Sequence, residues 1–440
     1  MLKKKQVITL VTIALASFLM GTMFGVVTMA SGKGGNPFDV IWEAIFDLDE
    51  RLKAVEEKLR VRELTVFSLW GGTEEENLKQ ALARFEEITG ISVRHIGYST
   101  HELLVTVPTQ LKAGVSIADV VIAPWPSWIL NLAAEGYLAS LTDLIDTTKF
   151  PQTYLDPVTA NNEIWAAPFK VSGKPGFWYR KSFFTANGLT VPTTYEEFKT
   201  LLTTIQGIPG VEAAIASGNG IGWPLSDTTE AFLMGLGGHQ LQMDLIFGDR
   251  QFTSTEVKDV FVELVSLLQA DYFSAPDDWY AQVARVWDGT YGIYFQGSFI
   301  TSIEPFASNL DDVAFFPFPE TDGVSAAVDY AFVPAFTEHP NEAMQLLEFL
   351  ASAEAQEIMV GLGGFLAPHL DVPDSAYRLI DLEVLQFMRT VNVVPDLDDA
   401  IGGEFQLTFW NQLKLLWADP TTDLDVLLQS LQDAWSPPPF

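Results

Sequence analysis

After an N-terminal segment, short apolar runs alternate with amphipathic stretches, and this alternation restricts the chain to an α/β fold. Residues 64–68, 92–96 and 118–123 have the length and apolar character of buried strands. Each is followed by a stretch with helical periodicity after a short turn. Such alternation predicts a parallel sheet covered by helices on both faces. Ligands of these sheets bind beyond the carboxyl ends of the strands, which points to the loops at 70–73 and 124–127.

Helix starts are marked by two capping-box patterns. Thr73 is followed three residues later by Glu76, and Thr194 by Glu197, so a helix is expected to begin at each pair. A further strand is expected at 174–179, followed later by a flexible glycine loop at 218–222. The longer amphipathic stretches predict helices at 255–269, 341–359, 405–417 and 424–435.

The N-terminus predicts the compartment. Lys3, Lys4 and Lys5 precede an uncharged apolar run at 7–30. As a helix this run measures about 36 Å, which is enough to cross a hydrocarbon core of about 30 Å. We expect an uncleaved, single-pass membrane anchor with the lysines cytoplasmic and the rest of the chain extracellular. The alternative is a cleaved secretory signal, for which residues 28–30 offer a small-residue cleavage site.

A stalk is expected between this anchor and the α/β region. Residues 31–35 have the composition of a flexible hinge, and the next segment repeats apolar residues at alternating spacings of three and four. This seam indicates either a short coiled coil that joins copies of the chain into a homo-oligomer, or a single amphipathic helix. Its members are Phe38, Ile41, Ile45, Leu48, Leu52, Val55 and Leu59.

Composition excludes several classes of function. The chain of 440 residues has 57 acidic and 25 basic residues, a net charge of −32, so nucleic acid is not expected as a partner. Cysteine is absent, which removes disulfides and thiolate metal sites. The five histidines are scattered, and no catalytic motif is present, so the chain is not expected to be an enzyme or to need a cofactor or metal. Three aspartates, Asp396, Asp398 and Asp399, resemble a calcium loop, but a solvated acidic loop is the preferred interpretation.

The chain has 12 tryptophans, and their number and positions are the most informative clue to its ligand. Aromatic faces stack on the C–H faces of sugars, whereas burial in the core is the ordinary role of the residue. Helical spacing favours the core for Trp287 and Trp417. Ligand contact is favoured for Trp70 and Trp223, each flanked by glycine, and four tryptophans are expected in loops beside glycine or proline: Trp70, Trp125, Trp223 and Trp279.

Four segments resemble a known family. Residues 64–90, 118–138, 168–198 and 289–299 are similar to the extracellular solute-binding proteins of carbohydrate ABC importers, the maltose- and multiple-sugar-binding proteins. The most specific stretch is WYRKSFF…GL…P.TYEEF. The resemblance implies two α/β lobes joined by a hinge, with the ligand in the cleft and closure presenting both lobes to the permease.

The resemblance also implies the binding residues. Trp223 would be the sugar platform and Asp227 a hydroxyl acceptor, while Phe299 stands where the family often has a stacking tryptophan. Asp329 and Phe365 fall near the cleft and the hinge. The full expected set is Trp70, Thr73, Glu74, Trp125, Ser127, Trp223, Asp227, Trp279, Phe299, Asp329 and Phe365.

These features together predict a membrane-anchored extracellular receptor that binds oligosaccharides and delivers them to the transmembrane subunits of an ABC permease. The first alternative is a binding-protein fold used as a self-assembling cell-surface structural protein, and the second is a secreted glycosidase. The expected division is an anchor at 1–30, a hinge and stalk at 31–63, a first lobe at 64–168 plus about 335–370, and a second lobe at 169–334 plus about 371–440.

Overall fold

The computed structural model divides the chain into two units, Met1–Arg62 and Glu63–Phe440. It describes residues 45–47, 63–115, 117–218, 220–275 and 277–440. In the first unit, residues 45–47 are helical. The expected anchor at 7–30 and the rest of the expected stalk lie outside the described residues. Among the helices that the structure does describe, none is both long and apolar enough to cross a membrane.

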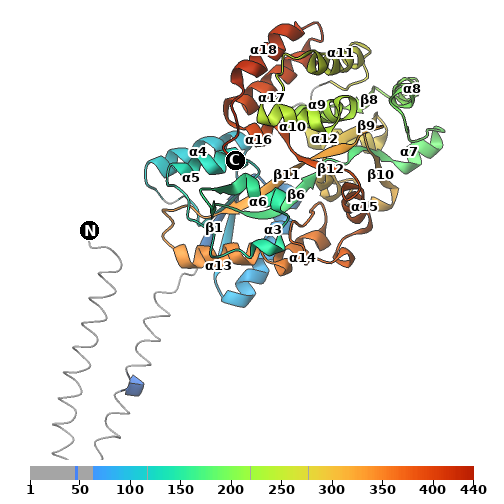
Figure 1. The fold of residues 1–440 in the computed structure, drawn as a ribbon. Coiled ribbons are helices and arrows are strands. Elements are labelled where there is room, and N and C mark those ends of the chain that lie inside the picture. The colour runs from blue at the N-terminus through green and yellow to red at the C-terminus, as the bar shows by residue number, and fades with distance from the viewer. Residues whose placement is uncertain (1–44, 48–62, 116, 219, 276) are drawn as a thin grey trace, which may run out of the picture. The chain divides into compact units, whose positions relative to one another are not determined.

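The second unit contains two large sheets and therefore two α/β lobes, as expected (Figure 1). A third sheet has only the two short strands β4 (Thr159–Ala160) and β5 (Glu163–Ile164). The first sheet has six strands in the order β12-β11-β3-β1-β2, with β6 also paired to β11. The strands are β1 (Glu63–Ser68), β2 (Ser92–Gly97), β3 (Val120–Ala123), β6 (Ala167–Gly173), β11 (Gly323–Phe332) and β12 (Asn392–Pro395). β1, β2 and β3 confirm three predicted strands.

The three predicted strands pair in parallel, as expected, but the sheet as a whole is mixed. β1 pairs in parallel with β2 and β3, but β11 runs antiparallel to both β3 and β6. The helices of this lobe are α3 (Gly72–Thr89), α4 (Thr100–Lys112), α5 (Pro126–Ala134), α6 (Gln152–Leu155), α13 (Pro340–Leu350) and α14 (Ala353–Leu362). α13 and α14 contact α3, and α13 also contacts β3 and β11.

The second sheet has the order β10-β7-β9-β8. Its strands are β7 (Gly176–Arg180), β8 (Ala213–Ala216), β9 (Tyr291–Gln296) and β10 (Val313–Phe316). Its core is rich in phenylalanine: the rings of Phe177 and Phe316 stack 5.5 Å apart, and Phe198 lies 4.9 Å from Phe177. All three are buried, and burying each ring contributes about 1.5–3 kcal/mol.

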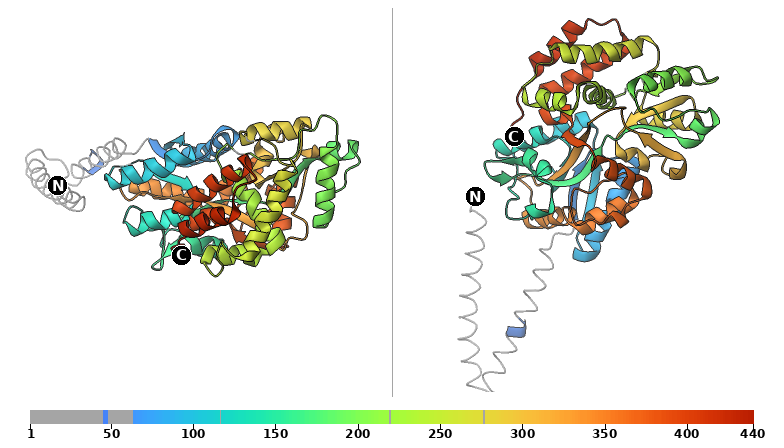
Figure 2. Two further views of the ribbon diagram at one scale, coloured as in Figure 1. Left: turned by 90° about the horizontal axis from the view of Figure 1, so that it is seen from above. Right: turned by 45° about the vertical axis from the view of Figure 1, so that its right-hand side comes forward.

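Helices surround the second sheet. They are α7 (Lys181–Ala186), α8 (Tyr195–Gln206), α9 (Trp223–Gly237), α10 (His239–Phe247), α11 (Thr255–Gln269), α12 (Trp279–Asp288), α16 (Leu397–Ile401), α17 (Gly403–Ala418) and α18 (Leu424–Ala434). The C-terminal pair α17 and α18 lies beside α9 and α11 (Figure 2). A further helix, α15 (Leu379–Met388), contacts β6 and the short 3-10 helix Ser298–Ser302.

The chain passes between the two sheets at three places, and two of them, at Lys174 and Asp396, border the site described below. β6 leads to β7 through Lys174 and Pro175, β10 leads to β11, and β12 leads to α16 through Asp396. Sheet pairing differs from the expected division of the chain at β6, β11 and β12. These strands lie wholly or mostly within the expected second lobe but belong to the first sheet. Which residues move together as each lobe stays a prediction.

Some predicted helix and strand boundaries were wrong. α3 begins at Gly72 after Gly71 with no side-chain cap, so Thr73 and Glu76 do not form the expected capping box. The stretch 341–359 is two helices, because Ser352 starts a new one by accepting a hydrogen bond from the Ala355 amide. The strand expected at 174–179 begins at Gly176 instead.

Other boundaries agree with the sequence. Thr194 and Glu197 form the predicted capping box of α8, in which each side chain accepts from the other residue's backbone amide. Helix α11 has the predicted bounds Thr255–Gln269. Both predictions depended only on the local sequence pattern, because neighbouring residues are sufficient to specify where these helices begin and end.

Candidate functional site

A cavity of about 340 Å³ lies between the two lobes. The first lobe contributes Trp70 and Glu74 from the β1–α3 turn, and Trp125 from the turn before α5. The second lobe contributes residues of α9 and α12, including Trp223 and Trp279. Because β1 and β3 are parallel, their carboxyl ends meet at the same edge of the sheet, which brings both first-lobe turns to the cavity.

Three aromatic rings from the second lobe form one wall. The ring of Trp223 lies 5.4 Å from Trp279 and 5.8 Å from Phe299, both edge-on. Trp279 and Phe299 are 5.5 Å apart and also edge-on. The prediction that Trp223 and Trp279 lie in loops was wrong, because each is the first residue of a helix, α9 and α12 respectively. Both side chains nevertheless line the cavity.

Gly222 allows Trp223 to take this position. Its φ of 131° lies in the region that glycine tolerates and other residues rarely adopt. A Cβ atom at this glycine would lie 2.6 Å from the Cβ of Trp410, which is closer than real side chains approach. The start of α9 is therefore packed directly against α17.

The ring of Trp70 lies in the opposite wall, and further rings pack behind it. Trp70 stacks on Phe169 at 5.7 Å, and Phe169 packs edge-on against Phe365 at 5.3 Å. The ammonium of Lys170 lies 4.8 Å from the centre of the Trp70 ring and 5.6 Å from that of Phe299. Lys170 also forms an ion pair with Glu74. This lysine therefore joins an aromatic ring from each wall of the cavity.

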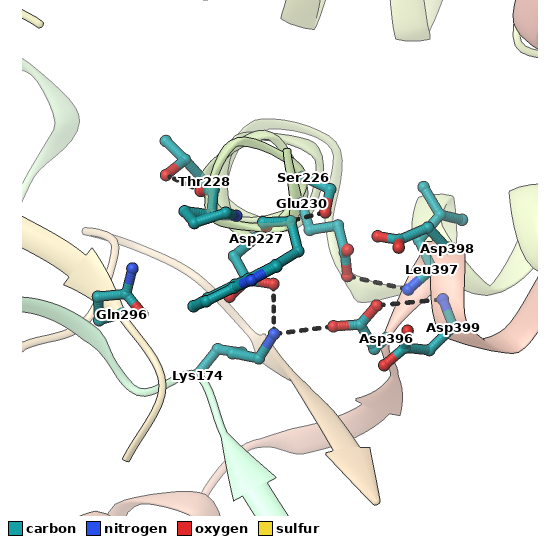
Figure 3. A network of polar contacts seen from close by, with 12 residues as sticks. Lys174, Ser226, Asp227, Thr228, Glu230, Gln296, Asp396, Leu397, Asp398 and Asp399 are labelled. Carbon is teal, nitrogen blue, oxygen red and sulfur yellow. Dashed lines mark hydrogen bonds and ion pairs between the residues drawn. The ribbon is translucent and has the colours of Figure 1, made fainter. Parts of the chain in front are cut away.

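Lys174 occupies the centre of a buried charge network beside the cavity (Figure 3). Its ammonium donates to Oδ2 of Asp396 at 2.8 Å and to Oδ1 of Asp227. Glu230, one turn further along α9, accepts from the Leu397 amide at 3.0 Å and from Gln242. The network ties the crossing after β6 and the crossing after β12 to helix α9.

Asp398 and Asp399 extend the network. Oδ2 of Asp398 accepts from the indole nitrogen of Trp410 at 2.8 Å. The amide of Gln406 donates to Oδ1 of Asp399 at 2.9 Å and to Asp398 at 3.2 Å. Asp396 and Asp398 are 4% and 2% exposed, so the interpretation of this segment as a solvated acidic loop was wrong.

Burial changes the titration of these groups. It raises the pKa of Asp227 to about 7, of Asp398 to about 8 and of Asp329 to about 6. Burial alone would lower the pKa of Lys174, but the carboxylates of Asp227 and Asp396 outweigh it and hold this pKa well above its usual value. The excess of buried carboxylates is therefore compensated partly by the lysine and partly by bound protons.

Two triads of this network bring carboxylate oxygens within 4.8 Å of one another: Asp227, Glu230 and Asp396, and Asp396, Asp398 and Asp399. Oxygen atoms at such distances suit a hard divalent cation in principle. The Lys174 ammonium already contacts Asp227 and Asp396, so a protein cation takes that place in the first triad.

The structure gathers most of the residues expected at the site. Thr73 is exposed on α3 and does not line the cavity. Ser127 is buried in α5, where its hydroxyl donates to the Ala400 carbonyl. Phe365 lies behind Phe169. The expected residues that line the cavity are Trp70, Glu74, Trp125, Trp223, Asp227, Trp279, Phe299 and Asp329.

Sequence reasoning missed several charged and aromatic residues at the cavity. A usable signal existed for two of them, because a lysine within or directly after a fully buried strand needs a buried partner. The strand is β6, which contains Lys170 and ends just before Lys174. The missed residues are Tyr98, Lys170, Lys174, Tyr280, Asp396, Asp398, Asp399 and Trp410.

Two α/β lobes around an aromatic-lined cleft define a two-lobed binding protein. The chain belongs to the bacterial extracellular solute-binding protein family, whose model matches residues 71–357. This confirms the family expected from the sequence. A Pyrococcus horikoshii relative, described as an uncharacterized ABC transporter extracellular-binding protein, is 39% identical over 373 residues, which are 84% of this chain and 87% of the relative.

Other similar proteins are more distant. The alpha-glucosides-binding periplasmic protein AglE of Rhizobium meliloti is 26% identical over 72% of this chain and 75% of its own length. The solved structure of a chitin oligosaccharide binding protein superposes with a TM-score of 0.72 at 18% identity, covering 84% of this chain and 97% of that one. The GacH receptor of Streptomyces glaucescens gives a TM-score of 0.72 at 16% identity, covering 85% and 97%. These two structures share the fold.

Proposed function

We propose that this protein is a membrane-anchored extracellular receptor that binds oligosaccharides in the cleft and delivers them to an ABC permease. The observation that carries the proposal is the composition of the cavity. Aromatic rings from both lobes stand beside carboxylates within about 340 Å³. Family membership supports a receptor of an importer rather than a catalyst.

Sugar chemistry fits this cavity. Pyranose rings offer flat C–H faces that stack on indole, for which Trp223 and Trp70 provide one ring in each wall. Sugar hydroxyls donate hydrogen bonds, and Asp227 and Asp329 provide acceptors. The named ligands of two similar proteins, alpha-glucosides and chitin oligosaccharides, support the same class of ligand.

Closure is proposed to occur at the chain crossings. The residues between β6 and β7, between β10 and β11, and between β12 and α16 join the two sheets. A few residues at the ends of such elements absorb the rotation when two lobes close on a ligand. A closed pair of lobes would then present one continuous surface to the permease.

Membrane attachment is proposed from the sequence. Lys3–Lys5 beside the apolar run at 7–30 predict an anchor with the binding unit outside. Protease added to intact cells should digest the chain beyond residue 31. A C-terminus that stays fully protected in intact cells and becomes sensitive after lysis would contradict this topology.

A thermal-shift screen of the purified protein against a panel of oligosaccharides tests the binding function. A ligand at about 100 times its Kd should stabilise the folded state by about 2.7 kcal/mol. Maltotriose, trehalose, cellotriose and chitotriose cover different linkages, and amino acids of similar size serve as controls. No shift with any sugar at millimolar concentration would contradict the proposal.

A further inference from the structure

The cavity between the lobes is lined by more carboxyl groups than cationic groups. Six carboxylates line it, together with two lysines, and neither histidine nor arginine is among its described lining residues. Both lysines are already in ion pairs, Lys170 with Glu74 and Lys174 with Asp227 and Asp396. An incoming negative group would therefore find no free cation among the described residues of the cavity.

Two of the lining carboxylates still have acceptor capacity. Oδ2 of Asp227 and Oδ1 of Asp398 are buried and have no hydrogen-bond partner among the described residues. A buried acceptor without a donor costs free energy that a ligand can recover by supplying that donor. Both residues line the cavity, so the ionised form of either carboxylate has an acceptor oxygen for a donor that a ligand supplies.

The aromatic walls are also suited to positive charge. The ammonium of Lys170 already lies over the rings of Trp70 and Phe299, at 4.8 and 5.6 Å. In the described part of the chain no lysine or arginine lies over Trp223 or Trp279, which line the same cavity. Ring faces beside carboxylates attract ammonium groups through the ring quadrupole as well as through the full charges.

We propose that the cleft excludes acidic sugars and prefers a sugar that bears a protonated amino group over its neutral parent. This inference depends on the proposed sugar-binding function and names its ligand class more narrowly. A hydroxyl supplies one donor to the two carboxylate oxygens that have no partner, whereas an ammonium supplies three donors together with a charge. A sugar carboxylate would instead have to separate a buried lysine from its partner, which leaves an uncompensated buried charge.

Without a ligand, bound protons neutralise part of the negative charge of the cavity carboxylates. Burial raises the pKa of Asp227 to about 7 and that of Asp398 to about 8. An ammonium group near these carboxylates favours their ionised forms, so protons leave as the amino sugar binds. Proton release on binding therefore distinguishes an ammonium placed at these carboxylates from one placed elsewhere in the cleft.

The test is calorimetric titration of the intact protein at pH 7 with matched sugars. Glucose, glucosamine and glucuronate form one series, and galactose, galactosamine and galacturonate form the second. Cellotriose and the β-1,4-linked glucosamine trimer extend the comparison to oligosaccharides. We expect an amino sugar to bind about tenfold more tightly than its neutral parent, because hydrogen bonds to charged groups are stronger than neutral ones by about that factor. The uronates should show no measurable binding.

Two variants, each titrated in two buffers, test whether the preference for amino sugars depends on Asp398. Asp398→Asn should bring the affinity ratio of amino to neutral sugar close to one and reduce proton release. Proton release is measured by titrating in two buffers of different ionisation enthalpy. The control Asp433→Asn makes the same substitution at an exposed position on α18 and should leave both quantities unchanged.

The outcomes separate this inference from the function on which it depends. If neutral sugars bind and amino sugars bind no more tightly, or if uronates bind, the preference for amino sugars is overturned and the sugar receptor stands. An unchanged ratio in Asp398→Asn would also overturn it. If neither neutral nor amino sugars bind, and the wider panel gives no thermal shift, the proposed function itself fails.

Discussion

The ammonium of Lys174 lies 2.8 Å from Oδ2 of Asp396, although the two residues stand on different chain crossings between the lobes. Lys174 follows β6 and Asp396 follows β12, and the lysine also contacts Asp227 of α9. All three side chains are at least nine-tenths buried. One lysine thus holds together two crossings and the first turns of the helix that carries Trp223.

Lys174→Met is expected to destabilise the protein strongly. The variant keeps most of the side-chain volume but leaves Asp227 and Asp396 buried without their cation, which costs about 3–5 kcal/mol. Urea unfolding measures the loss. The control is Lys258→Met, whose partner Asp425 is 74% exposed, and such surface pairs contribute about 0–1 kcal/mol. Equal losses in the two variants would contradict the importance of the buried pair.

Trp223→Ala and Trp417→Ala should separate binding from stability. Loss of the Trp223 ring removes an anchor from the proposed sugar site and should cost about 2–4 kcal/mol of binding, or about 30- to 1,000-fold in Kd. Trp417 is 8% exposed and packs edge-on against Phe273 at 5.3 Å, so its truncation should leave a cavity that costs about 3–5 kcal/mol of folding. Calorimetric titration and urea unfolding of both variants measure the two effects. Wild-type affinity in Trp223→Ala would remove this residue from the site.

The unfolding free energy should depend on pH through Asp398. Burial raises its pKa to about 8, whereas an aspartate in an unfolded chain titrates near about 3.9. Between these values the native state holds a proton that the unfolded state lacks. The contribution of Asp398 to stability is therefore complete below about pH 4 and is lost as the pH rises toward 8, at no more than about 1.4 kcal/mol per pH unit.

Asp398→Asn removes this titration. Between pH 5 and pH 8 the wild type should lose stability relative to the variant, as measured by urea unfolding at several pH values. The exposed Asp433→Asn serves as the control, and the pH-dependent difference should be larger for Asp398→Asn. A difference from wild type that does not change over this range would contradict the protonated state of the buried carboxyl.

The heptad seam at 38–59 should associate when expressed alone. Replacing Leu48 and Leu52 by aspartate places charges in the seam and should convert an oligomer into monomers, because a buried charge at these positions is not tolerated. Lys53→Asp, outside the seam, is the control. Analytical ultracentrifugation gives the mass. A monomeric wild-type segment at high concentration would show that the stalk is a single helix.

Local sequence pattern predicted the elements whose causes are local. The strands β1 and β2 follow from short apolar runs, and α8 from the capping box of Thr194 and Glu197. The break between α13 and α14 was missed because both helices carry apolar faces and Ser352 interrupts them without glycine or proline. The antiparallel insertion of β11 depends on partners in β3 and β6, far away in the chain, which no local pattern reports.

The candidate site divides in the same way. The tryptophans beside glycine and proline were found because turn residues mark the ends of strands and helices. The charge network was missed because its contacts join residues that are distant in sequence: 222 positions separate Lys174 from Asp396. Asp398 is a partial exception, since its donors Gln406 and Trp410 stand only 8 and 12 positions further along the chain. A short acidic run can be buried only where donors such as these reach it, so the aspartates alone do not show whether the run is solvated or buried.

The position of β11 and β12 in the first sheet also determines when that sheet can be completed. β3 pairs with β11 through Ala123 and Tyr330, and β11 in turn pairs with β12, which ends at Pro395. During synthesis, β1, β2 and β3 are made long before β11 and β12. One edge of β3 therefore stays unpaired until most of the remaining chain has been made. Pairing over such separations is slow because a long loop must close first. Nearly the whole chain must therefore be made before the N-terminal strands reach their native sheet, and until then the open edge of β3 is a site for wrong pairing with other chains.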